Sequence, residues 1–346
     1  MRQSHRLRAP LASVFALALL VPLAACASGS SADAPTGESL VIYSGRSEEL
    51  VGPLFEEFTQ QTGIPVQARF GDSAELAAQM LEEGDRTPAQ VFFSQDAGSL
   101  GAVAAAGLLA ALPTTVAESV PLAYRSGDGT WTGVTGRSRV IVFDAQQVSA
   151  EAVPTSVLDL VDPKWKGQVA IAPTNASFQA FVTAMRRSEG DQATEQWLAG
   201  LVANEVQAYE KNSLILDAVD AGQVQLGLIN HYYWFEKAAE VGSDAMRAQI
   251  AFTKPEDAGS LVNVAGVGIT AGAAGNPAAE QFVTWLLTPQ VQQWFGDNTY
   301  EYPLASGVDP ADGLPLLSEL KGPDVGLADL ADLPGTLEML ARVGLL

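Results

Sequence analysis

Short apolar runs alternate along the chain with longer segments whose apolar residues recur every three or four positions. Leu40–Tyr43 has the first pattern and residues 50–58 have the second, which places their apolar side chains on one face of a helix. The same order returns at 65–70 and at 90–94, each followed by a helical segment. A β-α repeat of this kind predicts an α/β protein with a parallel sheet and helices on both faces.

Two extended apolar runs lie outside this repeat, at 137–144 and at 264–270. We interpret them as crossings between two lobes, because each separates one block of alternating strands and helices from another. The predicted division assigns residues 39–137 plus 263–313 to lobe I and residues 138–262 plus 314–346 to lobe II.

The first residues have the composition of an export signal, with arginines before an apolar run that ends at Leu23-Ala24-Ala25-Cys26. This ending is similar to the lipobox of bacterial lipoproteins. We therefore expect residues 1–26 to be a signal peptide whose Cys26 is lipidated, and residues 27–38, which are small and polar, to be a flexible tether. Cys26 is the single cysteine of the chain, so a disulfide framework is excluded.

Composition limits the remaining possibilities. The 346 residues are 47% hydrophobic, as expected for a folded globular protein, and carry a formal net charge of −21, which disfavours binding to nucleic acid or anionic lipid. The sequence contains neither a Gly-x-Ser-x-Gly elbow nor a His-Glu-x-x-His motif, and a cysteine nucleophile is missing. We therefore do not expect an enzyme.

The most informative stretch is Leu228–Glu236, where Tyr232 and Tyr233 stand between a predicted strand and a predicted helix. At such a junction two adjacent side chains can point to the same place. Phenolate is a hard anionic oxygen ligand that suits a small, highly charged cation, of which ferric iron is the biological example. The same residues would also suit an aromatic core or an apolar cleft.

Seven stretches together resemble the bacterial ferric-ion-binding proteins, which are solute-binding proteins of ABC importers. They lie in the same order and at similar spacing, at 40–45, 81–89, 136–140, 163–167, 211–213, 229–234 and 302–304. The resemblance implies a two-lobed periplasmic-binding-protein-like fold with an interlobe cleft. It also implies a monomer, anchored to the cell membrane by its lipid, that delivers ferric iron to a permease and its ATPase.

The resemblance implies that Tyr232 and Tyr233 bind the iron directly. Family members usually add a histidine and a glutamate from the first lobe, but this chain has Ser47 and Gln95 at those positions. His231 is not assigned as a ligand. The carboxylates near predicted strand ends that could replace the missing ligands, or could simply cap helices, are Asp96, Glu48 and Asp72.

Family members often bind a small anion together with the iron. The positions that bind phosphate correspond to Asn175, Ala176, Ser177, Asn212 and Asn230, and an arginine that holds carbonate corresponds to Arg137. The first three residues begin a predicted helix, whose free backbone N–H groups suit an anion, although plain helix capping is the better explanation of this stretch taken alone. The alternative function is the same fold binding a phosphonate, a sugar phosphate, another organic anion or a polyamine.

Overall fold

The computed structural model describes residues 39–346. The predicted signal peptide, the lipidation of Cys26 and the tether lie outside these residues. Within 39–346, no helix combines the length and the apolar character that a membrane crossing requires.

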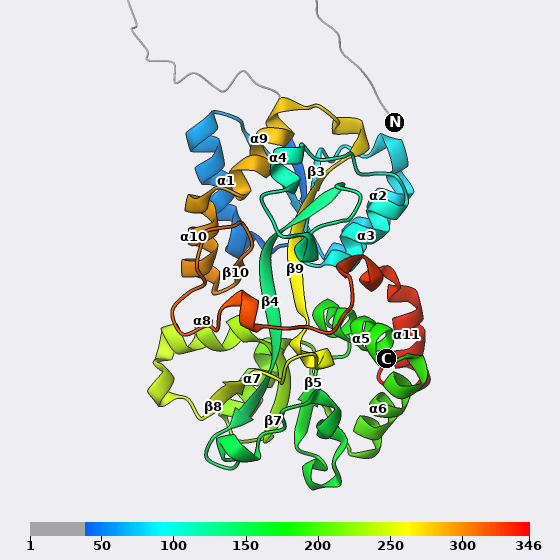
Figure 1. Cartoon of the computed structure of the whole chain (residues 1–346), viewed down its shortest axis with the longest axis vertical. Coiled ribbons are helices and arrows are strands. Elements are labelled where there is room, and N and C mark those ends of the chain that lie inside the picture. The colour runs from blue at the N-terminus through cyan, green and yellow to red at the C-terminus, as the bar shows by residue number, and fades with distance from the viewer. Residues whose placement is uncertain (1–38) are drawn as a thin grey trace, which may run out of the picture. The chain divides into compact units, whose positions relative to one another are not determined.

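The strands of residues 39–346 belong to one mixed sheet, shown in Figure 1. Its order is β2-β1-β3-β9-β4-β7-β5-β6, and β8 and β10 also pair with β4. The predicted parallel β-α repeat is confirmed for β1, β2 and β3, but β9 continues their sheet in the antiparallel direction. The strands are β1 (Leu40–Ser44), β2 (Val66–Phe70), β3 (Val91–Ser94), β4 (Trp131–Asp144), β5 (Val169–Ile171), β6 (Gln207–Ala208), β7 (Leu226–Asn230), β8 (Ala248–Ala251), β9 (Val262–Ile269) and β10 (Tyr302–Pro303).

The strand β4 connects the two halves of the fold. It pairs with β9 as far as Ser138 and with β7 from Arg139 onward. All its residues are buried. In Figure 1, β4 and β9 run side by side from one group of helices to the other. The crossing begins at Trp131, six residues earlier than the apolar run predicts, because polar Thr132 and Thr135 belong to the strand as well.

Helices cover the sheet. Those whose buried apolar residues belong to the cluster around Phe58 and Phe93 are α1 (Glu48–Thr62), α2 (Ser73–Glu83), α3 (Ala97–Ala105), α4 (Thr114–Ala117), α9 (Pro277–Leu286) and α10 (Pro289–Thr299). The others are α5 (Ala176–Ser188), α6 (Asp191–Ala203), α7 (Asn212–Asp220), α8 (His231–Val241) and α11 (Leu333–Arg342). The helix α1 ends where Gly63 takes a left-handed conformation, with φ of 74°. The short helical turn η10 (Leu327–Ala331) precedes α11.

The buried apolar residues form separate clusters on the two sides of the crossing, as a two-lobed fold requires. One cluster surrounds Phe58, Phe93 and Phe282, and two others surround Phe178 and Ile215. The C-terminal segment 314–346, predicted to belong to lobe II, is shared. Its residues Leu327 and Leu330 join the first cluster, whereas Met339 and Leu340 join the second. Residues 37–346 form one compact unit, so the exact lobe bounds stay a prediction.

Candidate metal and anion site

A polar cavity of about 270 Å³ brings together residues from both sides of the crossing. The loops after β1, β2 and β3 contribute one wall, as expected for an α/β sheet, in which ligands bind beyond the carboxyl ends of the strands. The beginnings of α5 and α8 and the loop before α7 contribute the other. The lining residues are Gly45, Asp72, Ser73, Gln95, Asp96, Arg137, Thr174, Asn175, Ala176, Ser177, Glu210, Lys211, Asn230, Tyr232 and Tyr233.

The tyrosine pair occupies the first turn of α8, which begins at His231 directly after β7. The two rings stack with centroids 4.4 Å apart. Tyr232 is 7% exposed. Burial raises the pKa of the Tyr232 hydroxyl well above its usual value, and the charge of Tyr233 adds to this, while Arg137 opposes it. The pair can offer two phenol oxygens to a cation that is able to displace their protons.

The predicted anion-binding residues also lie together. Asn175 caps α5, and its Oδ1 accepts hydrogen bonds from the backbone N–H and the hydroxyl of Ser177, at 3.1 and 2.6 Å. Asn212 is buried behind them and donates to Ser177 Oγ at 3.3 Å, but it does not line the cavity. Ala176 and Asn230 do line it. Asn175 and Ser177 therefore satisfy each other's polar groups, and the start of α5 faces the cavity.

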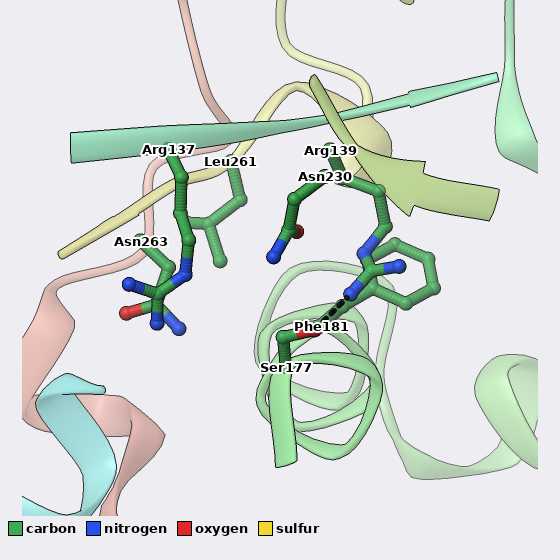
Figure 2. Close-up of a pocket in the computed structure, with 7 residues that line it drawn as sticks. All are labelled: Arg137, Arg139, Ser177, Phe181, Asn230, Leu261 and Asn263. Atoms are coloured by element: carbon green, nitrogen blue, oxygen red, sulfur yellow. Dashed lines mark hydrogen bonds between the residues drawn. The ribbon is translucent and has the colours of Figure 1, made fainter. Parts of the chain in front are cut away.

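Two arginines project from alternate positions of β4 toward this region. Arg137 is 1% exposed and donates from Nη2 to the carbonyl oxygen of Gln95. Arg139 donates from Nη2 to Ser177 Oγ at 3.0 Å, as Figure 2 shows, and from Nη1 to the Leu228 carbonyl oxygen at 3.3 Å. Burial lowers the pKa of Arg137 and lowers that of Arg139 to about 9. Sequence reasoning missed Arg139, although the period of two along a strand places it on the same face as Arg137.

The first-lobe residues that were considered as additional iron ligands do not all reach the cavity. Gln95 and Asp96 line the cavity, whereas Ser47 is exposed and does not. The Asp96 carboxylate caps α3 by accepting from the backbone N–H and the hydroxyl of Ser99, at 2.8 and 3.0 Å. Burial raises the pKa of Asp96. Asp72 also lines the cavity while capping α2. Both carboxylates therefore act as helix caps at its edge.

Glu48 is exposed in the first turn of α1 and lies outside the lining. In residues 39–346, His, Cys, Asp and Glu do not gather in groups of three or more that could hold a metal. The hard oxygen donors gathered at the cavity are instead phenols, hydroxyls and amides, with the two capping carboxylates and the carboxylate of Glu210 beside them.

Two buried features near the tyrosines were not predicted from the sequence. Arg46 forms an ion pair with Glu301, with N–O distances of 3.0 and 2.6 Å, and both side chains are 1% exposed. His231 is buried and does not line the cavity. Its Nδ1 lies 3.2 Å from the backbone N of Ser138, and its Nε2 lies 2.8 Å from the Tyr300 carbonyl oxygen. His231 is thus hydrogen-bonded in the interior, and its omission from the ligand set stays a prediction.

The mixed sheet crossed by β4, with a polar cavity between two groups of helices, is the arrangement of a solute-binding protein. The family model for bacterial extracellular solute-binding proteins matches residues 86–331, and the chain belongs to that family. Within it, the chain is a member of the bacterial ferric-iron-binding proteins.

This membership rests on full-length similarity. The Fe(3+)-binding periplasmic protein of Serratia marcescens is 35% identical over 337 residues, which cover 97% of this chain and 98% of that relative. The major ferric iron-binding protein of Neisseria meningitidis serogroup B is 32% identical, over 92% of this chain and 97% of the relative.

Solved structures agree with the fold. Iron-bound HitA from Pseudomonas aeruginosa superimposes with a TM-score of 0.83 at 32% identity, covering 88% of this chain and 99% of HitA. The Trichodesmium protein IdiA (FutA), in complex with iron and citrate, gives a TM-score of 0.77 at 26% identity, covering 89% of this chain and 100% of that protein. The predicted two-lobed periplasmic-binding-protein-like fold is thereby confirmed.

Proposed function

We propose that this chain captures ferric iron in the polar cavity, with Tyr232 and Tyr233 as its protein ligands, and delivers it to an ABC permease and its ATPase. The observation that carries the proposal is the stacked tyrosine pair lining a cavity in a chain of this family. Two phenolates would supply two of the three negative charges that neutralise the ion, in a site that partly excludes water.

A small anion completes the charge balance in this proposal. Two arguments support it. Ser47 lies outside the cavity lining and Gln95 has no charge, so the first lobe offers few strong ligands for the remaining coordination positions. The start of α5 at Asn175–Ser177 and the guanidinium of Arg137 offer the positive potential that an anion prefers. A phosphate-like anion is our first expectation, and citrate is a second because it accompanies iron in the Trichodesmium protein.

The alternative is that an organic or phosphorus-containing anion, rather than iron, is the cargo. Such a ligand would use Arg137 and the start of α5 and would leave both phenols protonated. A polyamine is less suited, because the arginines that approach the cavity are cationic. The two cargoes therefore differ in one measurable property, the ionisation of the tyrosines.

A titration with ferric iron, followed by visible absorbance with and without phosphate, tests the proposal. We expect a tyrosinate-to-iron charge-transfer band that saturates at one iron per chain. Tyr232→Phe and Tyr233→Phe should each weaken or abolish it, whereas Tyr209→Phe, which alters a tyrosine outside the lining, should leave it unchanged. Absence of the band in the unaltered protein, with thermal stabilisation by an organic anion, would establish the alternative.

The membrane attachment is a separate proposal. We propose that lipidation of Cys26 anchors the protein to the outer surface of the cell membrane and that it works as a monomer. The small-residue segment 27–38 would let the lobes reach the permease. Mass spectrometry of the protein isolated from membranes tests this, since a diacylglyceryl or triacyl group on an N-terminal Cys26 is expected. A soluble, unmodified N-terminus would contradict the anchor without affecting the iron proposal.

A further inference from the structure

Tyr300 adopts a backbone conformation that its residue type disfavours. It ends α10 with φ of 53°, in the left-handed region where a helix end usually carries glycine or asparagine. A bulky side chain in this conformation is strained, and such strain persists only where the surrounding contacts hold it. The contacts of Tyr300 therefore indicate its role.

The chain on both sides of Tyr300 is fixed to one part of the molecule. The preceding helix α10 contributes to the cluster around Phe58. The following residue, Glu301, forms the buried ion pair with Arg46, and β10 then pairs with β4. The position of Tyr300 is thus set from both directions along the chain.

Tyr300 contacts α8, the helix that carries the tyrosine pair, at two points one turn apart. Its carbonyl oxygen accepts a hydrogen bond from Nε2–H of His231, at 2.8 Å. Its ring stacks on the ring of Phe235, with centroids 5.8 Å apart and planes inclined by 23°. His231 and Phe235 are four residues apart and so lie on one face of α8. The other ring nitrogen of His231 accepts from the backbone N–H of Ser138 in β4, at 3.2 Å, so both ends of the ring are held.

The helix α8 packs against a different cluster, the one around Ile215. Tyr300 therefore links a segment fixed in one cluster to a helix that packs against another. It does so at the tyrosine pair, because His231 directly precedes Tyr232 and Tyr233. Supporting contacts of this kind hold the ligands of a metal site in their working orientation.

We infer that Tyr300 is a positioning residue for the iron site. It clamps the first turn of α8 through His231 and Phe235, and it thereby fixes the directions in which the phenols of Tyr232 and Tyr233 point. Neither contact uses the Tyr300 hydroxyl, so the clamp depends on the ring and on the left-handed backbone. The inference rests on the proposed function, because it takes the tyrosine pair as the place where iron binds.

Release of iron to a competing chelator, followed by the tyrosinate-to-iron charge-transfer band, tests the clamp in the loaded protein. Tyr300→Ala should shift the band and speed release by about three- to tenfold, the factor that corresponds to one aromatic stack. Tyr300→Phe keeps the ring and should match the unaltered protein in both respects. Phe55→Leu, which removes a ring stacked on Phe70 in α1, is the control and should lower the Tm without changing the band or the release. An unshifted band and unchanged release in Tyr300→Ala would overturn the inference.

Tyr300→Gly separates positioning from stability. Glycine removes the ring but takes the left-handed backbone without strain, so this variant should unfold at a higher temperature than Tyr300→Ala. It should nevertheless release iron as fast as Tyr300→Ala, because the stack on Phe235 is lost in both. Release rates that instead follow the Tm across the variants would assign Tyr300 a purely structural role.

The clamp is also measurable without iron. In isotope-labelled, iron-free protein, the buried Nε2–H of His231 should give a slowly exchanging NMR signal, because it is bonded to the Tyr300 carbonyl oxygen. The signal should persist in Tyr300→Phe and exchange faster in Tyr300→Ala, and equal protection in the alanine variant would overturn the clamp. Absence of the charge-transfer band in the unaltered protein, together with this NMR pattern, would refute iron as the cargo and leave the clamp standing.

Discussion

The ring of Tyr233 lies against the ring of Tyr232, with the two planes inclined by only 28°. Successive residues of a helix project about 100° apart around its axis, so neighbouring side chains normally diverge. Here the pair stands in the first turn of α8, directly after β7, and both side chains line the polar cavity. The junction between strand and helix thus presents two phenols to one place, which a regular helix or strand would not do.

Iron binding should release protons and should strengthen as pH rises. Burial raises the pKa of Tyr232, so its hydroxyl keeps its proton at neutral pH until a cation displaces it. If both phenols become ligands, about two protons are released per iron. The logarithm of the iron affinity then rises by about two for each pH unit, once competition from other iron ligands in solution is corrected for. Calorimetry in buffers of different ionisation enthalpy counts these protons. Tyr233→Phe should reduce the count by one, and an unchanged count would remove Tyr233 from the ligand set.

The buried ion pair between Arg46 and Glu301 should contribute strongly to the free energy of unfolding. Glu301→Gln leaves the Arg46 guanidinium buried without its partner, and we expect a loss of about 3–5 kcal/mol in the free energy of unfolding. Urea denaturation measures it. The control is Glu205→Gln, which breaks an exposed pair with Lys166 and should cost less than about 1 kcal/mol. Similar losses of stability in the two variants would show that the buried pair contributes no more to stability than the exposed pair.

Local sequence pattern identified the parts of the site that are contiguous in the chain. The tyrosine pair and the capped start of α5 at Asn175–Ser177 are short motifs, and each was predicted with the element that carries it. The partners Arg46 and Glu301 are 255 residues apart, so the local pattern does not connect them. Arginine side chains are usually exposed, so the sequence does not predict that Arg46 is buried.

The fold was predictable to a similar extent. Apolar periodicity located β1, α1 and most other elements of the repeat, because each buries one continuous face. It did not predict that β9 runs antiparallel beside β3, since direction is a property of the whole topology rather than of any segment. It also missed α6, whose buried apolar residues are only Trp197, Leu198 and Leu201. The shared C-terminal segment likewise depends on contacts between residues far apart in sequence.

The single histidine of residues 39–346 should make the fold sensitive to moderate acid. Burial lowers the pKa of His231 to about 4, from a usual value of 6.5. The hydrogen-bond pattern agrees with a neutral ring, with Nε2–H donating to Tyr300 and Nδ1 accepting from Ser138. As pH falls below about 6.5, the unfolded chain takes up the proton first, so stability declines until about pH 4, by about 3 kcal/mol in total.

His231→Gln removes the titrating group and should flatten this part of the pH profile, even if it lowers stability at pH 7. Urea unfolding at pH 7 and pH 5 for both proteins provides the comparison. An identical decline in the variant would assign the acid sensitivity to another group.

Gly98 sets how closely the C-terminal segment approaches the first lobe. A Cβ at this position of α3 would lie 2.9 Å from the carbonyl oxygen of Leu330, which is backbone and cannot rotate away. Because Leu327 and Leu330 belong to the core of that lobe while α11 packs in the other, a displaced η10 would loosen a connection between the two. We therefore expect Gly98→Ala to lower the free energy of unfolding by about 1–3 kcal/mol, despite the better helix propensity of alanine.

The matched control for this variant is Gly296→Ala in α10. The nearest neighbour of its added Cβ would be Pro303 Cγ at 3.6 Å, an ordinary van der Waals contact. Helix propensity is then the main change, and Gly296→Ala should be neutral or stabilising by up to about 1 kcal/mol. Hydrogen exchange adds spatial resolution, since faster exchange in Gly98→Ala should be concentrated in residues 327–342. Equal stability of the two variants, with unchanged exchange there, would mean that the segment accommodates the methyl group and that its contact with α3 does not constrain the lobes.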